Sequence, residues 1–137
     1  MPDQNYMSNL KNLIMVIEDE SLLLQAIGKK LKREGFEVLM CTHAGQAIDY
    51  LKSLEDLPDV IWLDYYLTDM NGGEFVDLLN RNEKWRLIPV IVVSNSASDQ
   101  KVQLLLKKGV KRHILKADYR LDQIVDIIKS YIDKEVK

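Results

Sequence analysis

The chain has little of what would direct it to a membrane, a secretory route or nucleic acid. Its 137 residues include one cysteine, Cys41, so no internal disulfide can form, which fits a reducing compartment. No apolar run approaches the roughly 18 residues that span a bilayer, and residues 1–9 contain no signal-peptide core. Basic and acidic residues nearly balance, at 19 and 21. We therefore expect a cytoplasmic protein that binds no membrane and no nucleic acid.

Several organising motifs are also missing. The sequence contains no GxGxxG and no P-loop lysine motif, which argues against nucleotide binding. It has no internal repeat, no linker and no low-complexity segment. The length is close to the usual size of one domain, and 47% hydrophobic residues can fill one core. We expect a flexible leader over residues 1–12 and a single domain over residues 13–137.

Apolar runs alternate with amphipathic segments along the chain. Short runs rich in β-branched residues predict five strands, at 13–17, 36–40, 59–63, 90–93 and 113–115. A segment with apolar residues at helical spacing follows each of them, with Ser21 and Thr42 as candidate caps of the first two helices. Five strands alternating with five helices predict a doubly wound α/β domain, in which helices cover both faces of a parallel sheet.

Polar residues follow four of the predicted strands. They are Glu18, Asp19 and Glu20 after the first strand, Asp64 after the third, Ser94 after the fourth and Lys116 after the fifth. In open parallel sheets the ligand crevice lies at the carboxyl ends of the strands, so these side chains should meet there. Adjacent carboxylates repel unless a cation joins them, and an all-oxygen ligand set favours Mg²⁺. For Glu20 alone, a role at the helix start is the simpler interpretation.

The remaining residue types suit phosphoryl transfer. A carboxylate such as Asp64 can attack phosphorus and form an acyl phosphate. An ammonium group at Lys116 and a hydroxyl at Ser94 could bind the phosphoryl oxygens. Taken singly, each has an ordinary alternative, namely a solvated lysine or a loop serine. Their shared position after apolar strands favours a site.

With these motifs the chain resembles the receiver domain of two-component response regulators, including the stand-alone chemotaxis regulators. The resemblance covers residues 13–132 and is carried by the motifs at 16–20, 59–64, 70–73, 89–94 and 114–116. It implies a flavodoxin-like fold with strand order 2-1-3-4-5. It also implies a phosphorylation-dependent signalling module that turns over only its own phosphoryl group and is not an enzyme for an external substrate.

The resemblance also assigns roles to individual residues. Asp64 would accept a phosphoryl group from a sensor histidine kinase or a phosphotransfer protein. Asp64 and Asp19 would ligate Mg²⁺ together with the backbone carbonyl of Tyr66, and Glu18 would assist. Lys116 would contact the phosphoryl oxygens. Ser94 and His113 would form the switch that changes the surface read by an output protein, which the sequence does not identify, and the module would act as a monomer or weak dimer.

Five positions depart from the usual pattern of that family. Ala117 replaces the proline after the lysine, and since a cis bond before a non-proline residue costs about 3 kcal/mol, we expect a trans bond. His113 stands in place of the switch aromatic residue. Thr68 and Asp69 replace a proline-containing pair, which should make that loop less rigid, and Asn95 replaces a small residue and could narrow access to the site.

Two other functions remain open at this stage. The departures at Ala117 and Asn95 would also suit a pseudo-receiver, an interaction module that works without phosphorylation. A phosphatase of the haloacid dehalogenase type would need a second aspartate two residues after the nucleophile, and that position is Tyr66. Tyr66 could instead shield an acyl phosphate from water. The basic residues between 107 and 112 could select an acidic partner, although a solvated surface is the simpler explanation.

Overall fold

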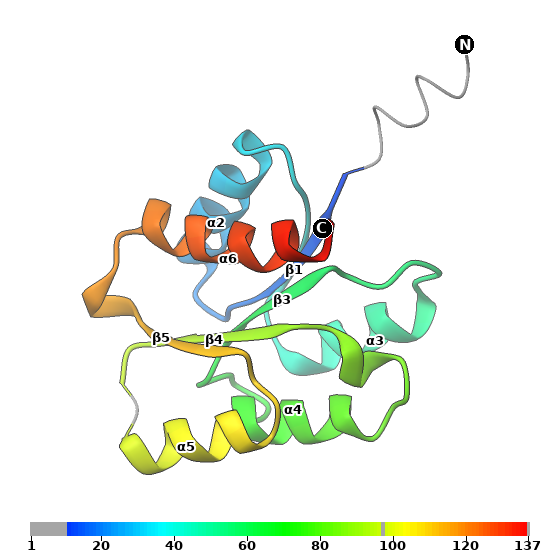
Figure 1. Ribbon diagram of the computed structural model, residues 1–137, viewed down its shortest axis with the longest axis vertical. Coiled ribbons are helices and arrows are strands. Elements are labelled where there is room, and N and C mark those ends of the chain that lie inside the picture. The colour runs from blue at the N-terminus through cyan, green and yellow to red at the C-terminus, as the bar shows by residue number, and fades with distance from the viewer. Residues whose placement is uncertain (1–10, 97, 137) are drawn as a thin grey trace.

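A computed structural model describes residues 11–96 and 98–136, with side chains as far as Ile132. Its centre is one parallel sheet with strand order β2-β1-β3-β4-β5, the order that the resemblance implied (Figure 1). The strands are β1 (Leu13–Ile17), β2 (Glu37–Cys41), β3 (Val60–Asp64), β4 (Val90–Ser94) and β5 (Arg112–Leu115). The predicted leader, residues 1–12, falls mostly outside the described residues, so its boundary stays a prediction.

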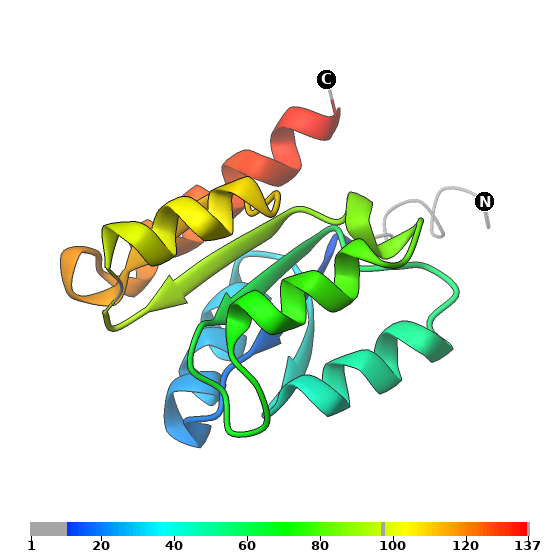
Figure 2. The same ribbon diagram turned by 90° about the horizontal axis from the view of Figure 1, so that it is seen from below.

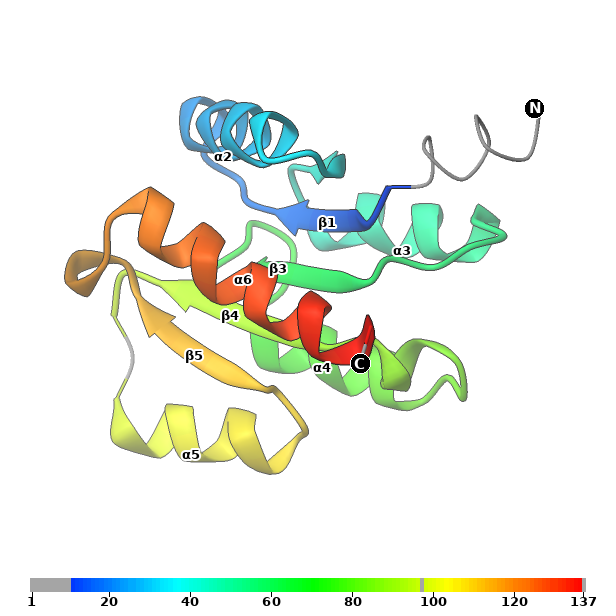
Figure 3. The same ribbon diagram turned by 45° about the horizontal axis from the view of Figure 1, so that its top comes forward.

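Five α-helices and two short 3₁₀ turns connect the strands of the described chain. They are α2 (Ser21–Arg33), α3 (Ala44–Ser53), α4 (Gly72–Asn80), η1 (Trp85–Leu87), α5 (Asp99–Lys107), η2 (Lys116–Asp118) and α6 (Leu121–Val136). Figures 1 and 3 show α2 and α6 on one face of the sheet. Seen from below, α3, α4 and α5 lie in front of the strands on the other face (Figure 2). The helices thus form the predicted layers above and below the sheet.

Burial explains why the short apolar runs become strands. Every residue of β3 and β4 is buried, and so are the last four residues of β1, because helices cover both faces of the sheet. β2 lies at an edge, and its first residue, Glu37, is exposed. Two core clusters result, one under α2 and α6 and one under α3, α4 and α5.

The pairing register aligns the strand ends that carry the polar residues. Ile17 pairs with Leu63, Asp64 with Val93, and Ser94 with Leu115. The carboxyl ends of β1, β3, β4 and β5 therefore end at one edge of the sheet. This alignment is what brings residues nearly one hundred positions apart in sequence to a common site.

Some predicted boundaries and caps were wrong by one or two residues. Ser21 is the first residue of α2 and not its cap, which is Glu20, and Glu20 makes no capping bond with its side chain. The cap of α3 is His43 and not Thr42. β2 begins at Glu37 instead of Phe36, because Phe36 N–H still bonds the carbonyl of Leu31 at the end of α2.

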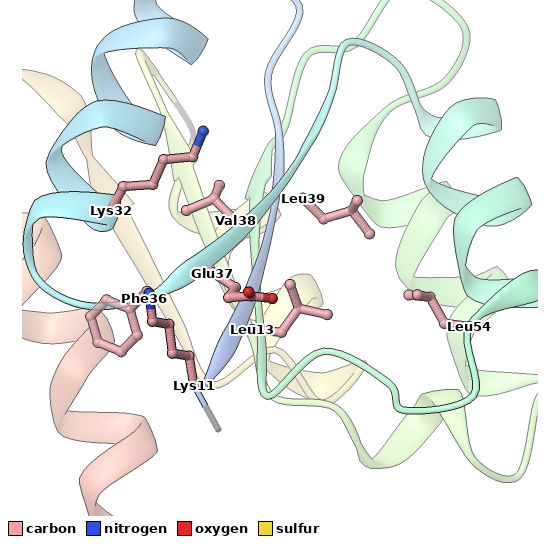
Figure 4. Close-up of a pocket in the computed structure, with 8 residues that line it drawn as sticks. All are labelled: Lys11, Leu13, Lys32, Phe36, Glu37, Val38, Leu39 and Leu54. Carbon is pink, nitrogen blue, oxygen red and sulfur yellow. The ribbon is translucent and has the colours of Figure 1, made fainter. Parts of the chain in front are cut away.

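One hollow of the described residues lies far from the polar strand ends. A pocket of about 560 Å³ opens near the start of β1 and β2, and Figure 4 shows Leu13, Glu37 and Leu54 among its lining. Lys11 and Lys32 also border it, and no acidic cluster or unpartnered buried polar atom lies there among the described residues. No helix of the described residues is long and apolar enough to cross a membrane.

Candidate functional site

Three carboxylates meet where β1 and β3 end. One oxygen each of Glu18, Asp19 and Asp64 lies within 4.8 Å of the others. Glu18 follows β1 directly and is 1% exposed, and Asp64, the last residue of β3, is 5% exposed. Asp19 is the most open of the three to solvent. The sequence predicted this cluster from the apolar runs that precede the acidic residues.

Lys116 reaches the carboxylates from η2, directly after β5. Its Nζ lies 3.0 Å from Oε1 of Glu18 and 3.9 Å from Oδ2 of Asp64. The second oxygen of Glu18 accepts a hydrogen bond of 3.0 Å from the backbone N–H of Glu20. The closest partner of Lys116 is therefore Glu18, and Asp64 is the second. The sequence predicted the gathering of these groups but not this order of partners.

The crowding of negative charge raises the pKa of two carboxyl groups. Burial and then the charge of Glu18 raise the pKa of Asp64 to about 7, although Lys116 and the Tyr66 N–H act in the opposite direction. The same two causes, burial and Glu18, raise the pKa of Asp19. A single lysine does not balance three carboxylates. The cluster has more negative charge than its protein partners neutralise.

The donor set fits Mg²⁺. All candidate ligand atoms are oxygens, and hard oxygen ligands are those that Mg²⁺ binds in proteins. A divalent cation would remove the repulsion that raises the pKa values of Asp19 and Asp64. Both oxygens of Glu18 already have protein partners, so Glu18 would assist such an ion directly or through water.

The loop between β3 and α4 is tied down by a residue whose role the sequence did not reveal. The carboxylate of Asp69 accepts hydrogen bonds from the N–H groups of Ala44 at 3.0 Å and Gly45 at 2.8 Å, at the start of α3. Burial acts to raise the pKa of Asp69, but these two bonds, the backbone N–H of Asp69 itself and nearby His43 together lower the pKa. The expectation of a less rigid loop at Thr68 and Asp69 overlooked this connection, because nothing in the local sequence indicates it.

The end of the same loop is fixed by a tight turn into α4. Asn71 and Glu74 form a capping box, in which each side chain accepts from the other's backbone N–H. The Gly72 N–H donates to the carbonyl of Tyr65 at 2.6 Å, and a Cβ at Gly72 would lie 3.1 Å from the Cα of Tyr65. Glycine therefore allows the backbone of Tyr65 to approach closely here, where a side chain would be tightly packed. The loop holds Tyr66, the predicted source of a carbonyl ligand, between two fixed ends.

Ser94 and His113 contact each other at the ends of neighbouring strands. Ser94 Oγ lies 2.8 Å from Nε2 of His113 and 3.2 Å from the carbonyl of Ser96, and Ser94 is fully buried. A hydroxyl has one hydrogen, so both bonds form together when Ser94 donates to Ser96 and His113 Nε2 donates to Ser94. Burial lowers the pKa of His113, which favours the neutral ring that this arrangement uses.

Lys101 from α5 contacts the two tyrosines that follow the candidate acceptor. Its Nζ lies 3.1 Å from the Tyr66 hydroxyl, and 5.0 and 5.1 Å from the ring centroids of Tyr65 and Tyr66. The two rings meet edge to face at 4.8 Å. The sequence analysis did not single out Lys101, since a lysine in the first turn of a helix has no distinguishing signal.

The bond before Ala117 is trans, as expected, since the described residues contain no cis peptide. Lys116, Ala117 and Asp118 instead form the short 3₁₀ turn η2, which leads toward α6. The chain after the lysine therefore continues in a helical turn with a trans bond before Ala117. Lys116 still reaches the carboxylates.

Comparisons with known proteins agree with this geometry. The family model of the response regulator receiver domain matches residues 14–129. The chain belongs to the response regulator receiver domain family. The chemotaxis protein CheY homolog of Campylobacter jejuni subsp. jejuni is 32% identical over 104 residues, which are 75% of this chain and 79% of that protein. The polar-differentiation response regulator DivK of Brucella ovis is 27% identical and covers 87% of this chain and 94% of its own.

Solved structures have the same fold. A CheY-like receiver domain protein from Methanospirillum hungatei JF-1 superimposes with a TM-score of 0.80 at 22% identity, covering 91% of this chain and 96% of the other. The non-phosphorylated HemR receiver domain from Leptospira biflexa gives 0.79 at 20% identity, covering 89% and 94%. These likenesses confirm the flavodoxin-like arrangement. The roles of single residues in this receiver domain remain for a proposal.

Proposed function

We propose that this receiver domain is switched by phosphorylation of Asp64. One observation carries the proposal: Lys116 Nζ lies between Glu18 and Asp64, at 3.0 and 3.9 Å, beside a crowded acidic cluster. A nucleophile, a set of metal ligands and a cation thus surround one small volume. A phosphoryl group needs these three partners in order to be transferred to a carboxylate.

The chemistry at Asp64 is a displacement at phosphorus. A carboxylate oxygen of Asp64 forms a bond to phosphorus while the bond from phosphorus to the donor breaks and the donor leaves with its electron pair. Asp19, Asp64 and the Tyr66 carbonyl would hold Mg²⁺, which when bound supplies positive charge to the phosphoryl oxygens. Lys116 supplies a second cation by turning from Glu18 to the new phosphoryl group.

The Ser94–His113 contact supports a switch at the same site. In the structure the Ser94 hydroxyl donates a hydrogen bond to the carbonyl of Ser96 and accepts one from the ring of His113. A phosphoryl oxygen on Asp64 is a stronger, charged acceptor, so Ser94 would leave both partners for it. His113 would then lose its partner and reorient, which changes the surface formed by α5, β5 and α6.

The family suggests the partners. Receiver domains of this kind act with histidine kinases and output proteins. We infer a kinase or phosphotransfer protein as donor, an output protein that binds the altered surface, a cytoplasmic location, and a monomer or weak dimer. Turnover would be limited to the domain's own acyl phosphate.

Labelling with a small phosphodonor tests the proposal. Incubation with Mg²⁺ and acetyl phosphate should add one phosphoryl group, detected by intact-protein mass spectrometry and removed by hydroxylamine. Asp64→Asn should abolish the label, and Asp19→Asn should weaken both labelling and Mg²⁺ binding, whereas the exposed control Asp56→Asn should change neither. An unlabelled wild type, under conditions that label another receiver domain, would overturn the proposal.

A pseudo-receiver is the second candidate, favoured by Ala117 and Asn95, which depart from the usual residues of the family at these positions. It predicts no measurable Mg²⁺ binding and no phosphoryl incorporation. It also predicts that the Asp64→Asn protein binds its partner as the wild type does. The labelling and Mg²⁺ titrations above therefore separate the two candidates directly.

A further inference from the structure

Lys101 forms an unusual group of contacts close to Asp64. Its ammonium is hydrogen-bonded to the Tyr66 hydroxyl and lies over the rings of both Tyr65 and Tyr66. The Tyr66 phenol has a lowered pKa, first through the bond from Lys101 and then through one from Ser96, while the charge of Asp64 acts to raise it. The backbone N–H of Tyr66 lies 3.4 Å from Oδ1 of Asp64, so the residue that carries this ring contacts the acceptor directly.

This contact links the loop after β3 to the start of α5. Tyr66 belongs to the loop after β3, and Lys101 lies in the first turn of α5, where its own N–H is capped by Ser98 at 3.2 Å. α5 buries only Leu105 among its described residues, so few apolar contacts fix its position. Lys108 fixes the end of α5 through bonds to Asp77 and Asn80, and the cation of Lys101, held by two rings and a hydroxyl, joins the start of α5 to the loop.

We propose that Lys101 is a positioning residue that holds the Tyr66 ring beside Asp64 and thereby slows hydrolysis of the acyl phosphate. The inference rests on the proposed function. In hydrolysis, a water oxygen bonds to phosphorus while the bond from phosphorus to the Asp64 oxygen breaks. Inorganic phosphate leaves, a proton passes to solvent, and the carboxylate is restored. A ring kept beside the acceptor occupies space that the attacking water needs, and a free ring does not.

The decay rate of the acyl phosphate tests the role of Lys101. The full chain is labelled with Mg²⁺ and acetyl phosphate, the donor is removed, and the label is followed over time. Lys101→Met should speed the decay about 5-fold, an effect typical of one lost cation–π and hydrogen-bond set. Lys101→Arg, which keeps a cation over the rings, should restore most of the lifetime. The control Lys107→Met alters an exposed lysine of the same helix and should decay as the wild type does.

A double substitution shows whether Lys101 acts through Tyr66. Tyr66→Asn alone should speed decay, and adding Lys101→Met to it should have no further effect. If Lys101 did not act through Tyr66, Lys101→Met would speed the decay by the same factor in the wild-type and the Tyr66→Asn protein. A second reading needs neither metal nor phosphate: in protein with ¹³C-labelled tyrosine, NMR titration should show that Lys101→Met raises the Tyr66 pKa while Lys107→Met does not.

The outcomes separate this inference from the proposed function. If the wild type takes no label, the proposed function fails and the titration alone reports on the contact. If the wild type is labelled but Lys101→Met decays at the wild-type rate, the positioning role of Lys101 is wrong while phosphorylation of Asp64 stands. An additive double variant would likewise overturn the inference.

Discussion

Asp64 is the residue at which the fold opposes ionisation most clearly. It is buried beside Glu18, and its pKa is raised to about 7 from an ordinary value near 3.8. Such a group takes up a proton on folding at mildly acidic pH. Sequence position marked Asp64 as important, but only its surroundings show that the metal-free protein carries an electrostatic cost there.

The first prediction concerns the stability of Asp64→Asn in metal-free buffer. Between about pH 4 and pH 7 the unfolded wild type loses the Asp64 proton while the folded state keeps it, so wild-type stability falls as pH rises. The asparagine variant lacks this loss. The difference in the free energy of unfolding between Asp64→Asn and the wild type should grow over that range and level off above pH 7. The final gain in the free energy of unfolding is on the order of 2 kcal/mol.

Urea unfolding at several pH values measures this gain. The control Asp56→Asn should follow the wild type, because Asp56 is exposed in a loop. Adding Mg²⁺ should narrow the difference between wild type and Asp64→Asn, since the ion stabilises only the carboxylate cluster. A gain of equal size at pH 4 and pH 8 would contradict the electrostatic explanation.

The adjacent ends of β4 and β5 hold the element that the switch would move. Register places Ser94 opposite Leu115, and the hydroxyl of Ser94 meets the imidazole of His113 at 2.8 Å. An aromatic residue of the family could not offer this ring N–H. We therefore expect the histidine to hold the serine away from a phosphoryl group on Asp64 by this direct hydrogen bond, worth about 1 kcal/mol.

His113→Phe should make the phosphorylated-like state easier to reach. The substitution keeps a ring on β5 but frees Ser94 from one of its two partners. With Mg²⁺ present, affinity for the phosphoryl mimic beryllofluoride should rise about 5-fold, measured by isothermal titration calorimetry. The chain's other histidine, exposed His43, supplies the control His43→Phe, which should leave the affinity unchanged. Weaker binding by His113→Phe would mean that the histidine assists the switch.

Both faces of the sheet contribute to one folded unit. Trp62 lies on β3 in the cluster under α2 and α6, and Trp85 packs against the cluster on the opposite face. The indole N–H of Trp62 is the one buried side-chain polar atom without a hydrogen-bond partner among the described residues. Trp62→Phe removes that unpaired group and leaves Trp85 as the only fluorescent tryptophan.

In this Trp62→Phe background, Ile128→Ala tests whether the two faces unfold together. Ile128 is fully buried on α6, so its truncation should cost about 3 kcal/mol. Because the strands are shared by both clusters, Trp85 fluorescence and far-UV circular dichroism should shift together to a lower urea midpoint. Ile127→Ala, at the neighbouring half-buried position, should cost clearly less. A Trp85 transition that stays at its original midpoint would show separate unfolding of the two faces.

Local sequence determined the strands, the helices and the polar residues at the strand ends. Runs such as Val60–Leu63 and Val90–Val93 are apolar throughout, so their side chains are buried on both sides only when the strand lies between two layers of helices. A parallel sheet then places the residues after those runs at one edge. Asp19, Asp64 and Lys116 could be brought together on this reasoning alone.

Tertiary structure decided which of these residues contact each other. The pairing of Lys116 with Glu18, of Ser94 with His113, of Lys101 with Tyr66 and of Asp69 with the start of α3 depends on side-chain direction and on the register of strands far apart in sequence. Lys116 Nζ, for example, lies 3.0 Å from Glu18 and 3.9 Å from Asp64, so a small difference in distance decides its first partner. Local periodicity does not specify these pairings, because they arise only when the helices and strands pack against one another.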